Sequence, residues 1–216
     1  RHGHSEWNLT DRFTGWTDIP LTEIGLAEAN AAGERLAKAG FHFDEVHISA
    51  LKRTRQTAEA LLAAMGTPDV PVYATWRLNE RHYGALQGLV KKEIFATWGE
   101  QESRRWWRGY RTPPPAVDHE DLRHPRFDPR YVELSPDDLP ATESLEDCQC
   151  RMLPYWHEVL APRVRDGRRL LIVSHGNTLR GLQFVRCPGH GLELGSGASN
   201  TALGGNRGRG ANPVGA

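Results

Sequence analysis

The chain has 216 residues, which is enough to bury the core of one α/β domain. Lys plus Arg and Asp plus Glu each number 27, so the net charge is zero and a globally basic nucleic-acid-binding surface is not expected. No apolar stretch approaches bilayer length, which argues against a membrane protein. An odd, sparse set of cysteines (Cys148, Cys150 and Cys187) argues against a disulfide framework and predicts a cytoplasmic protein.

The first half of the chain alternates helical and strand patterns. Expected in chain order are a helix over residues 22–39, a strand over 43–49, a helix over 49–65, a strand over 70–74 and a helix over 88–98. Thr22 and Ser49 are the candidate N-caps of the first two helices. Gly40 and Gly99 follow helix ends, where a residue without a side chain is favoured.

The second half contains a long irregular segment and one more helix–strand–helix unit. Residues 111–142 are rich in proline and charge, which predicts an insertion or lid and not a separate domain. A helix is expected from Ser144, with Pro154 kinking it and Pro162 helping to end it. Its apolar face carries Leu145, Met152, Trp156, Val159 and Leu160. A buried strand over 170–173 and a helix over 177–184 follow.

These elements together predict a three-layer α/β/α fold with a doubly wound, mostly parallel sheet. We expect one catalytic domain over residues 1–185. A strand should lead into His2, and that first strand is predicted to be missing from the sequence. Residues 186–216 hold nine of the 22 glycines and are predicted to form a Gly-rich, disordered tail.

Two His-Gly steps stand far apart in the sequence. His2-Gly3 follows Arg1, and His175-Gly176 directly follows the apolar run at 170–173. Parallel strands end at one edge of a sheet, so both histidines are expected in one pocket. A histidine can act as nucleophile or acid/base near neutral pH, and the planar cation of Arg1 suits a phosphoryl group. The pattern indicates phosphoryl transfer through histidine.

Further polar blocks follow these steps in a characteristic order. They are Arg1-His2-Gly3-His4-Ser5-Glu6-Trp7-Asn8, Arg12-Phe13-Thr14-Gly15-Trp16, Leu51-Lys52-Arg53-Thr54-Arg55, Glu80-Arg81-His82-Tyr83-Gly84, Thr142-Glu143-Ser144-Leu145 and Ser174-His175-Gly176-Asn177. In this order and spacing the chain resembles the histidine phosphatase superfamily, and in particular the cofactor-dependent phosphoglycerate mutases. The resemblance runs from Arg1 to about Leu182.

The resemblance implies a ping-pong phosphoryl transfer without metal. It makes His2 the nucleophile that becomes phosphohistidine, Glu80 the general acid/base, and Arg1, Arg53 and His175 the phosphoryl-pocket residues. The positions implied to contact substrate are Asn8, Thr14, Gly15, Arg81, His82, Tyr83, Lys91, Arg108, Gly176 and Asn177. The implied reaction interconverts 2-phosphoglycerate and 3-phosphoglycerate in glycolysis and gluconeogenesis. The resemblance also implies that 2,3-bisphosphoglycerate primes the enzyme. A homodimer is the oligomeric state that the resemblance implies.

The chain departs from the family pattern in three places. The family usually has an Arg-Arg pair where this chain has Trp107-Arg108, and Arg104 or Arg105 is a candidate substitute for the lost guanidinium. Such a loss should raise KM and change substrate preference. His4 stands where Glu is usual. Beyond Leu182, Gly-rich sequence replaces a patterned helix and a last strand.

For several of these residues, a structural or surface role is the alternative to a functional one. Arg53 and Lys91 could be solvated helix charges, and Tyr83 could belong to the core. The run at 104–108 could be a solvated basic patch with packed tryptophans instead of a substrate-anion clamp. At the level of function, the alternatives to a mutase are a phosphatase or bisphosphoglycerate-processing enzyme of the same fold, and an inactive truncated fragment.

Overall fold

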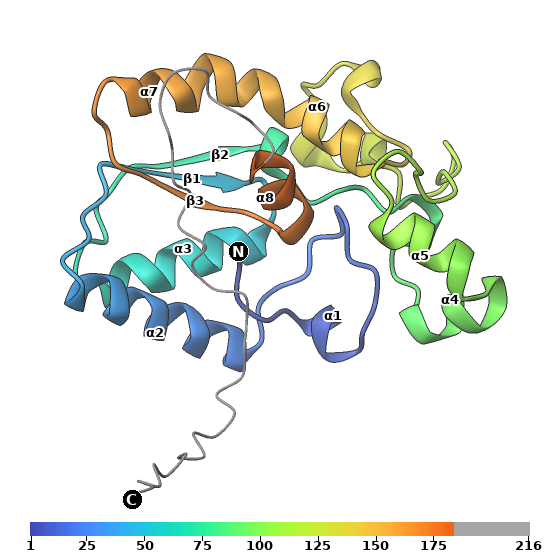
Figure 1. The fold of residues 1–216 in the computed structure, drawn as a ribbon, viewed down its shortest axis with the longest axis horizontal. Helices are drawn as coiled ribbons and strands as arrows, with labels where there is room; N and C mark the ends of the chain where they lie inside the picture. The colour runs from blue at the N-terminus through green and yellow to red at the C-terminus, as the bar shows by residue number, and fades with distance from the viewer. Residues whose placement is uncertain (184–216) are drawn as a thin grey trace, which may run out of the picture. The chain divides into compact units, whose positions relative to one another are not determined.

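The computed structural model describes residues 1–183, so the predictions for the 186–216 tail, for Cys187 and for the end of the last helix lie outside the described residues. The centre of the fold is a parallel sheet of strands β1 (Glu45–Ser49), β2 (Val72–Thr75) and β3 (Leu170–Val173), in the order β2-β1-β3. Val46 lies opposite Val72 and Ile48 lies opposite Val173. Helices flank the sheet, which confirms the predicted α/β fold class (Figure 1).

One face of the sheet is covered by α2 (Glu23–Lys38) and α3 (Lys52–Ala64) (Figure 1). Thr22 caps α2 as predicted, since its hydroxyl accepts a hydrogen bond from the Gly25 amide. The predicted cap of α3 is wrong. Ser49 still pairs with Thr75 in the sheet, so the helix begins later and Leu51 occupies its N-cap position.

The opposite face is covered by α6 (Leu145–Tyr155) and α7 (Ala161–Arg165), which are joined by a π-helical turn over Trp156–Leu160 (Figure 1). Pro154 lies inside α6, and the widened turn follows directly, because a proline removes one backbone donor. Pro162 does not end the helix as predicted. It lies in the first turn of α7, where a missing N–H costs nothing.

The remaining helices surround the carboxyl ends of the strands. They are α1 (Glu6–Leu9), α4 (Lys91–Trp98), α5 (Glu100–Arg108) and α8 (Gly176–Gln183), with 3₁₀ turns at Trp76–Leu78 and Gly84–Leu86. The helix predicted over 88–98 starts later because Gly88 has a φ of 87°, outside the helical range. No helix within residues 1–183 combines the length and apolarity needed to cross a membrane.

The proline-rich segment 111–142 folds against the domain through short 3₁₀ turns. These turns span Pro125–Phe127, Pro129–Tyr131 and Pro136–Asp138, and each is capped by the side chain that precedes it. Val117 and Tyr131 are buried, and the Tyr131 hydroxyl accepts a hydrogen bond of 2.8 Å from Asn79. No residue of this segment lines the cavity described below.

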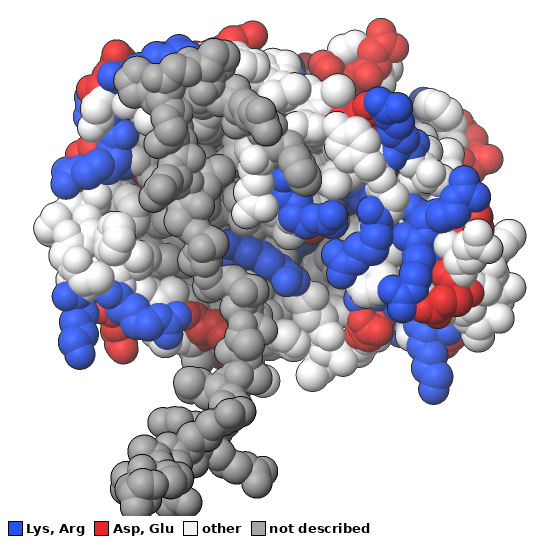
Figure 2. Space-filling model, viewed as in Figure 1, with Lys and Arg blue, Asp and Glu red and all other residues white. Residues whose placement is uncertain are grey.

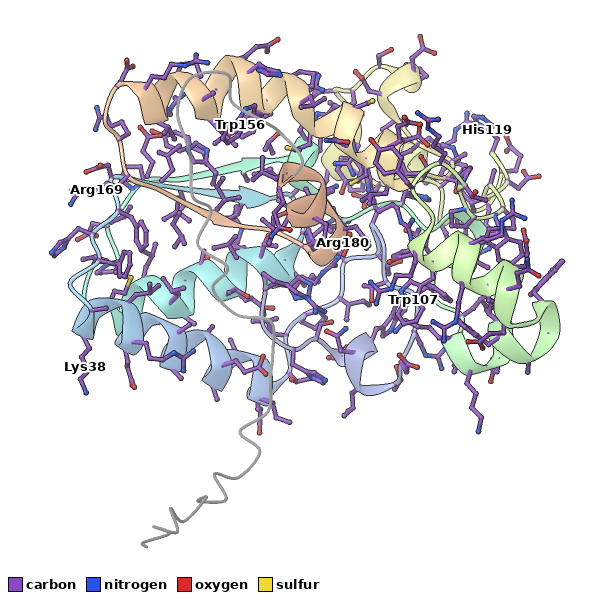
Figure 3. The ribbon with its side chains drawn as sticks, in the orientation of Figure 1. Lys38, Trp107, His119, Trp156, Arg169 and Arg180 are labelled. Carbon is purple, nitrogen blue, oxygen red and sulfur yellow. The ribbon has the colours of Figure 1, made fainter. Side chains whose placement is uncertain are left out.

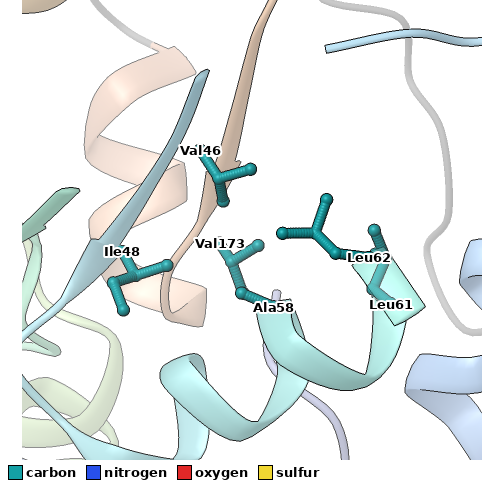
Figure 4. Close-up of a cluster of buried hydrophobic side chains, with 6 residues drawn as sticks. All are labelled: Val46, Ile48, Ala58, Leu61, Leu62 and Val173. Carbon is teal, nitrogen blue, oxygen red and sulfur yellow. The ribbon is translucent and has the colours of Figure 1, made fainter. Parts of the chain in front are cut away.

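Among residues 1–183, apolar clusters hold these layers together. The first joins β1, β3 and α3 through Val46, Ile48, Ala58, Leu61, Leu62 and Val173 (Figure 4). The second joins the segment before the sheet to α4 and α5 through Phe13, Tyr83, Leu86, Ile94 and Trp106. The first cluster fixes the strands, and the second attaches α4 and α5 beside the strand ends.

Candidate active site

A cavity of about 350 Å³ opens at the carboxyl ends of the strands, the usual place for a ligand in an open α/β sheet. It is lined by Arg1, His2, Asn8, Arg12, Phe13, Thr14, Gly15, Arg53, Glu80, Tyr83, Lys91, Trp107, Arg108, Gly176, Asn177 and Arg180. Lys and Arg side chains gather across the middle of this face (Figure 2). Glu80 is the only carboxylate among the lining residues, so the cavity is suited to an anion.

His2 is held in one tautomer by its own backbone. Its Nδ1 lies 2.7 Å from the Gly3 carbonyl oxygen, and because a carbonyl can only accept, Nδ1 must carry the proton. Nε2 therefore keeps its lone pair. Burial, reinforced by the nearby Arg53 charge, lowers the pKa of His2 well below 6.5. His2 is neutral at pH 7, with an unprotonated nitrogen in the cavity lining.

The position of His2 depends on close backbone approaches. Its amide donates to the Ser174 carbonyl at 3.0 Å, directly after β3. A Cβ on Gly3 would lie 2.3 Å from the Gly25 carbonyl oxygen, so only glycine allows this segment to lie on the first turn of α2. The glycine after His2 thus serves a backbone contact with α2.

Arg53 and His175 present buried donor or acceptor atoms that lack a partner. The Arg53 guanidinium donates to the carbonyls of Thr17 (2.9 Å) and Gly15 (2.8 Å), but its Nε has no partner within the described chain. The Nδ1 of His175 is likewise unpartnered there, and its Nε2 lies 2.8 Å from Ser49 Oγ. Unsatisfied buried polar atoms are rare in native proteins. A phosphoryl group beside His2 would supply oxygens of the kind these atoms need.

The electrostatics of these two residues follow from their burial. Burial lowers the pKa of Arg53 to about 10 although Glu80 and Asp18 raise it, so the guanidinium stays charged near neutral pH. Burial, and then the Arg53 charge, lowers the pKa of His175 well below 6.5. The two imidazole rings of His2 and His175 lie with their centroids 5.0 Å apart, as the paired His-Gly steps predicted.

Glu80 follows β2 and the 3₁₀ turn, and its carboxylate is held at one oxygen only. Oε1 accepts hydrogen bonds from the amides of Arg81 (2.9 Å) and Asn177 (3.2 Å). Within the described chain Oε2 makes no hydrogen bond, so it is the oxygen that can exchange a proton with a ligand. The Glu80 carbonyl accepts from the Trp16 indole at 2.7 Å.

Asn8, Tyr83 and Asn177 complete the polar lining near Glu80. Asn8 Oδ1 accepts from the amide and hydroxyl of Ser5, which leaves the Asn8 amide group as a donor. Asn177 donates through Nδ2 to the Tyr83 hydroxyl at 2.9 Å. Burial raises the pKa of Tyr83, so its hydroxyl stays protonated. Gly176 starts α8, which places the positive end of that helix dipole at the cavity wall.

Helices α4 and α5 form the outer wall of the cavity. The Trp107 ring lies between two cations, with Arg108 Cζ 4.2 Å and Lys91 Nζ 5.5 Å from its centroid. Lys91 also pairs with Asp11. Figure 3 shows Trp107 on α5 and Arg180 on α8 on the same face, and both line the cavity. This wall offers charge at a distance from the buried histidines.

Three of the residues predicted for the site do not line the cavity. His175 lies behind His2, as described above. Arg81 is fully buried and donates to the carbonyls of Trp106 (3.0 Å) and Trp107 (2.7 Å), so it anchors the end of α5. His82 is also fully buried, and its Nδ1 accepts from the Gly84 amide at 3.0 Å. Arg81 and His82 are therefore not among the lining residues, although Arg81 Nε and Nη1 and His82 Nε2 also lack a partner within the described chain.

The predicted substitutes for the family's second arginine point elsewhere. Arg104 and Arg105 are exposed and pair along α5 with Glu100 and Glu102 respectively, and neither lines the cavity. This follows from helical periodicity, since both lie on the surface of α5 away from the buried Trp106. Trp107 is therefore the residue that replaces the guanidinium.

Three lining residues were not singled out by sequence reasoning. Arg12 and Phe13 directly precede the predicted Thr14 and Gly15, and Arg180 lies one helical turn after Gly176. Positions i and i+4 of a helix share a face, so the periodicity of α8 could have identified Arg180. Arg12 donates to the Gly88 carbonyl at 2.6 Å, a contact that depends on a turn remote in sequence.

The fold and the cavity define an α/β protein with an anion site built around two histidines. A model of the histidine phosphatase superfamily (branch 1) matches residues 1–126, and the chain belongs to this family. This finding supports the superfamily resemblance stated from the sequence, and it leaves the particular activity undecided.

Solved structures with the same fold include a phosphatase and a mutase. A mycobacterial glucosyl-3-phosphoglycerate phosphatase is 27% identical, with a TM-score of 0.62 over 85% of this chain and 74% of that one. YhfR of Bacillus stearothermophilus is 28% identical, with a TM-score of 0.59 over 85% and 75%. A phosphoglycerate mutase from Bacillus anthracis is 20% identical, with a TM-score of 0.60 over 84% and 75%, and this likeness shows the fold alone.

Proposed function

We propose that this chain transfers a phosphoryl group between a phosphoglycerate and His2, and that it interconverts 2-phosphoglycerate and 3-phosphoglycerate. The observation that carries the proposal is the tautomer of His2, whose Nδ1 is committed to the Gly3 carbonyl and whose Nε2 keeps a lone pair. The ordered blocks from Arg1 to Asn177 support the same reaction. A phosphoglycerate is an anion at both ends, which suits a cavity lined mainly by cations.

In the first step, His2 Nε2 attacks phosphorus. The N–P bond forms as the P–O ester bond breaks, and the electron pair of that bond leaves with the substrate oxygen. Arg53 and Arg1, which line the cavity, stabilise the charge on the phosphoryl oxygens. Glu80 gives a proton to the leaving oxygen. In the second step Glu80 takes a proton from the hydroxyl that attacks the phosphohistidine.

The lining residues fit 2,3-bisphosphoglycerate as the priming phosphoryl donor. The unpartnered atoms near His2 suit one phosphoryl group, and Lys91, Arg108 and Arg180 suit the second anionic group. When bound, this donor would supply the phosphoryl group that loads His2. No step of the proposed reaction uses a metal ion.

A phosphatase acting on phosphoglycerate-type esters is the second candidate. Trp107 favours it, because an indole replaces a guanidinium that would hold a second anion. A phosphatase is also among the solved structures that are more than 25% identical. In this case water, instead of a substrate hydroxyl, gives up its proton to Glu80 and attacks phosphohistidine.

The two candidates are separated by the fate of the phosphoryl group. Purified protein is incubated with 3-phosphoglycerate and a trace of 2,3-bisphosphoglycerate, and both 2-phosphoglycerate and inorganic phosphate are measured. Isomer formation well in excess of phosphate release supports the mutase. Phosphate release without isomer formation assigns the phosphatase. If neither product forms and intact mass shows no acid-labile phosphoryl adduct, the proposal of phosphoryl transfer is wrong.

A further inference from the structure

A buried ion pair lies outside the cavity and has no role in the chemistry described so far. Glu143 directly precedes the N-cap of α6, and Arg151 lies within that helix. Arg151 Nε lies 2.6 Å from Glu143 Oε1 and Nη2 lies 2.9 Å from Oε2, so the pair is bidentate. The two side chains are 5% and 4% exposed. Neither residue lines the cavity.

The other donors of Arg151 bind the segment that carries Glu80. Nη1 donates to the carbonyls of Trp76 (3.1 Å) and Arg77 (2.9 Å), and the Nη2 hydrogen that does not bond Glu143 is shared between those of Asn79 and Glu80 (3.2 Å each). This segment leaves β2 and has few backbone partners of its own. Arg151 is the donor that these four buried carbonyls share. Those of Trp76, Asn79 and Glu80 also accept from the Asn79 amide, the Thr178 hydroxyl and the Trp16 indole respectively.

Glu143 holds the same segment on the other side of Glu80. Its Oε2 accepts from the His82 amide at 2.7 Å, and its own amide donates to the His82 carbonyl at 2.9 Å. The Arg151 guanidinium also lies 5.2 Å from the centroid of the Trp16 ring, whose indole N–H bonds the Glu80 carbonyl. Glu80 is thus fixed from both sides through its backbone.

The Arg151 guanidinium stays charged. Burial alone would lower the pKa of Arg151, but the facing Glu143 carboxylate raises it overall. A buried ion pair is in general weak evidence for added stability, because desolvation cancels much of the attraction. What distinguishes this pair is the number of backbone groups it bonds on either side of one carboxylate.

We propose that the Arg151–Glu143 pair is a positioning element that holds Glu80 at the correct distance for proton transfer to the leaving oxygen. The proposal rests on the acid/base role of Glu80 in the proposed function. A carboxyl must lie within hydrogen-bond reach of the oxygen it protonates, and a misplacement of about 1 Å costs about 10²-fold in rate. Without the pair, the four carbonyls from Trp76 to Glu80 would lose a shared donor, and the His82 amide would lose its acceptor.

The test compares two substrates that differ in their need for an acid. The leaving group of p-nitrophenyl phosphate departs as a stable anion, whereas 3-phosphoglycerate must expel an alkoxide that needs a proton. The rate of His2 phosphorylation is measured in single turnover for the wild type and for Arg151→Met/Glu143→Gln, which removes both charges together. We expect the rate with 3-phosphoglycerate to fall by about 10²-fold, and that with p-nitrophenyl phosphate by at most about threefold.

Controls separate positioning from general destabilisation. Arg163 and Glu45 form another Arg–Glu pair, at 2.8 Å and away from the cavity, so Arg163→Met/Glu45→Gln should leave the ratio of the two rates unchanged. An equal loss with both substrates in Arg151→Met/Glu143→Gln, or no loss with either, overturns the proposal. If that variant does not fold, Arg151→Lys keeps the charge but cannot bond all these carbonyls, and the same ratio decides the question.

Glu80→Gln distinguishes failure of this proposal from failure of the proposed function. Glu80→Gln should show the same selective loss with 3-phosphoglycerate. If it does not, Glu80 is not the acid and the proposed mechanism fails. If Glu80→Gln shows the selective loss and the double variant does not, only the positioning role of Arg151 and Glu143 is wrong.

Discussion

The two walls of the cavity are built in different ways. The strand-end wall carries His2, Arg53 and Glu80, whose side chains are fixed by hydrogen bonds to backbone groups of Gly3, Gly15 and Arg81 respectively. The helix wall carries Trp107 and Arg108 at the end of α5, where the Arg108 guanidinium lies over the Trp107 ring and makes no hydrogen bond within residues 1–183. In the proposed reaction, the strand-end wall performs the chemistry. The helix wall sets the affinity for the rest of the ligand.

The largest expected effect is the loss of the nucleophile from the strand-end wall. His2→Ala should abolish the acid-labile phosphoryl adduct and lower turnover by at least about 10³-fold, because the proposed covalent intermediate forms on His2. Intact-mass analysis and a rate assay measure both effects. His4→Ala is the matched control, since His4 does not line the cavity. An adduct that persists in His2→Ala would remove His2 from this role.

The next effect tests the planar cation of the same wall. Arg53→Lys keeps a charge but loses the fork that bonds Gly15 and Thr17, and it also loses the unpartnered Nε. We expect kcat/KM to fall by about 10²-fold, mainly through kcat. Arg55→Lys, at an exposed position of the same helix, should change neither constant. If KM rose and kcat stayed unchanged, Arg53 would bind the substrate without stabilising the transition state.

Acid should weaken the strand-end wall through its buried histidines. Burial lowers the pKa of His82 to about 3, below the ordinary 6.5 that applies in the unfolded chain. Between pH 6.5 and 3, the histidine is therefore protonated in the unfolded state and neutral in the folded state. As the pH is lowered through this range, the free energy of unfolding falls by about 1.4 kcal/mol per pH unit for such a histidine. Urea unfolding at pH 7 and pH 5 measures this slope.

His82→Asn identifies the contribution of this histidine. Asn Oδ1 can replace Nδ1 as acceptor for the Gly84 amide but does not titrate, so the fall in stability between pH 7 and pH 5 should be smaller than in the wild type. An unchanged slope would assign the acid sensitivity to the other buried histidines, His2 and His175.

A smaller effect is expected from the helix wall. Arg108→Gln should raise KM for 3-phosphoglycerate by about tenfold, with kcat within about twofold, because this side chain binds charge remote from the reacting bond. Arg104→Gln is the control, since Arg104 is exposed and pairs with Glu100. If kcat fell by as much as kcat/KM, the assignment of separate roles to the two walls would be contradicted.

The smallest effect concerns the residue that departs from the family pattern. Trp107→Arg restores a second guanidinium beside Arg108 and should lower KM for 3-phosphoglycerate by about threefold. Trp107→Phe keeps an aromatic face for Arg108 and Lys91 and should change KM less. A higher KM in Trp107→Arg would show that the indole itself contributes to ligand binding.

The amino-acid sequence was enough to predict the alternation of helices with strands. It was also enough to predict the superfamily. Apolar runs such as residues 170–173, and glycines after helix ends, are local signals that fix element type. The two His-Gly steps predicted a shared pocket because parallel strands end at one edge, and the 5.0 Å separation of the rings agrees with it.

Only the tertiary structure decided which candidate residues face the cavity. Arg81 and His82 belong to the same block as Glu80, yet the backbone turns them into the interior, where one anchors α5 and the other bonds Gly84. Arg12 reaches the cavity with a long-range contact to the Gly88 carbonyl that no local pattern encodes. The Arg151–Glu143 pair joins α6 to residues more than seventy positions earlier, and such long-range contacts are formed only when the packed layers bring distant segments together.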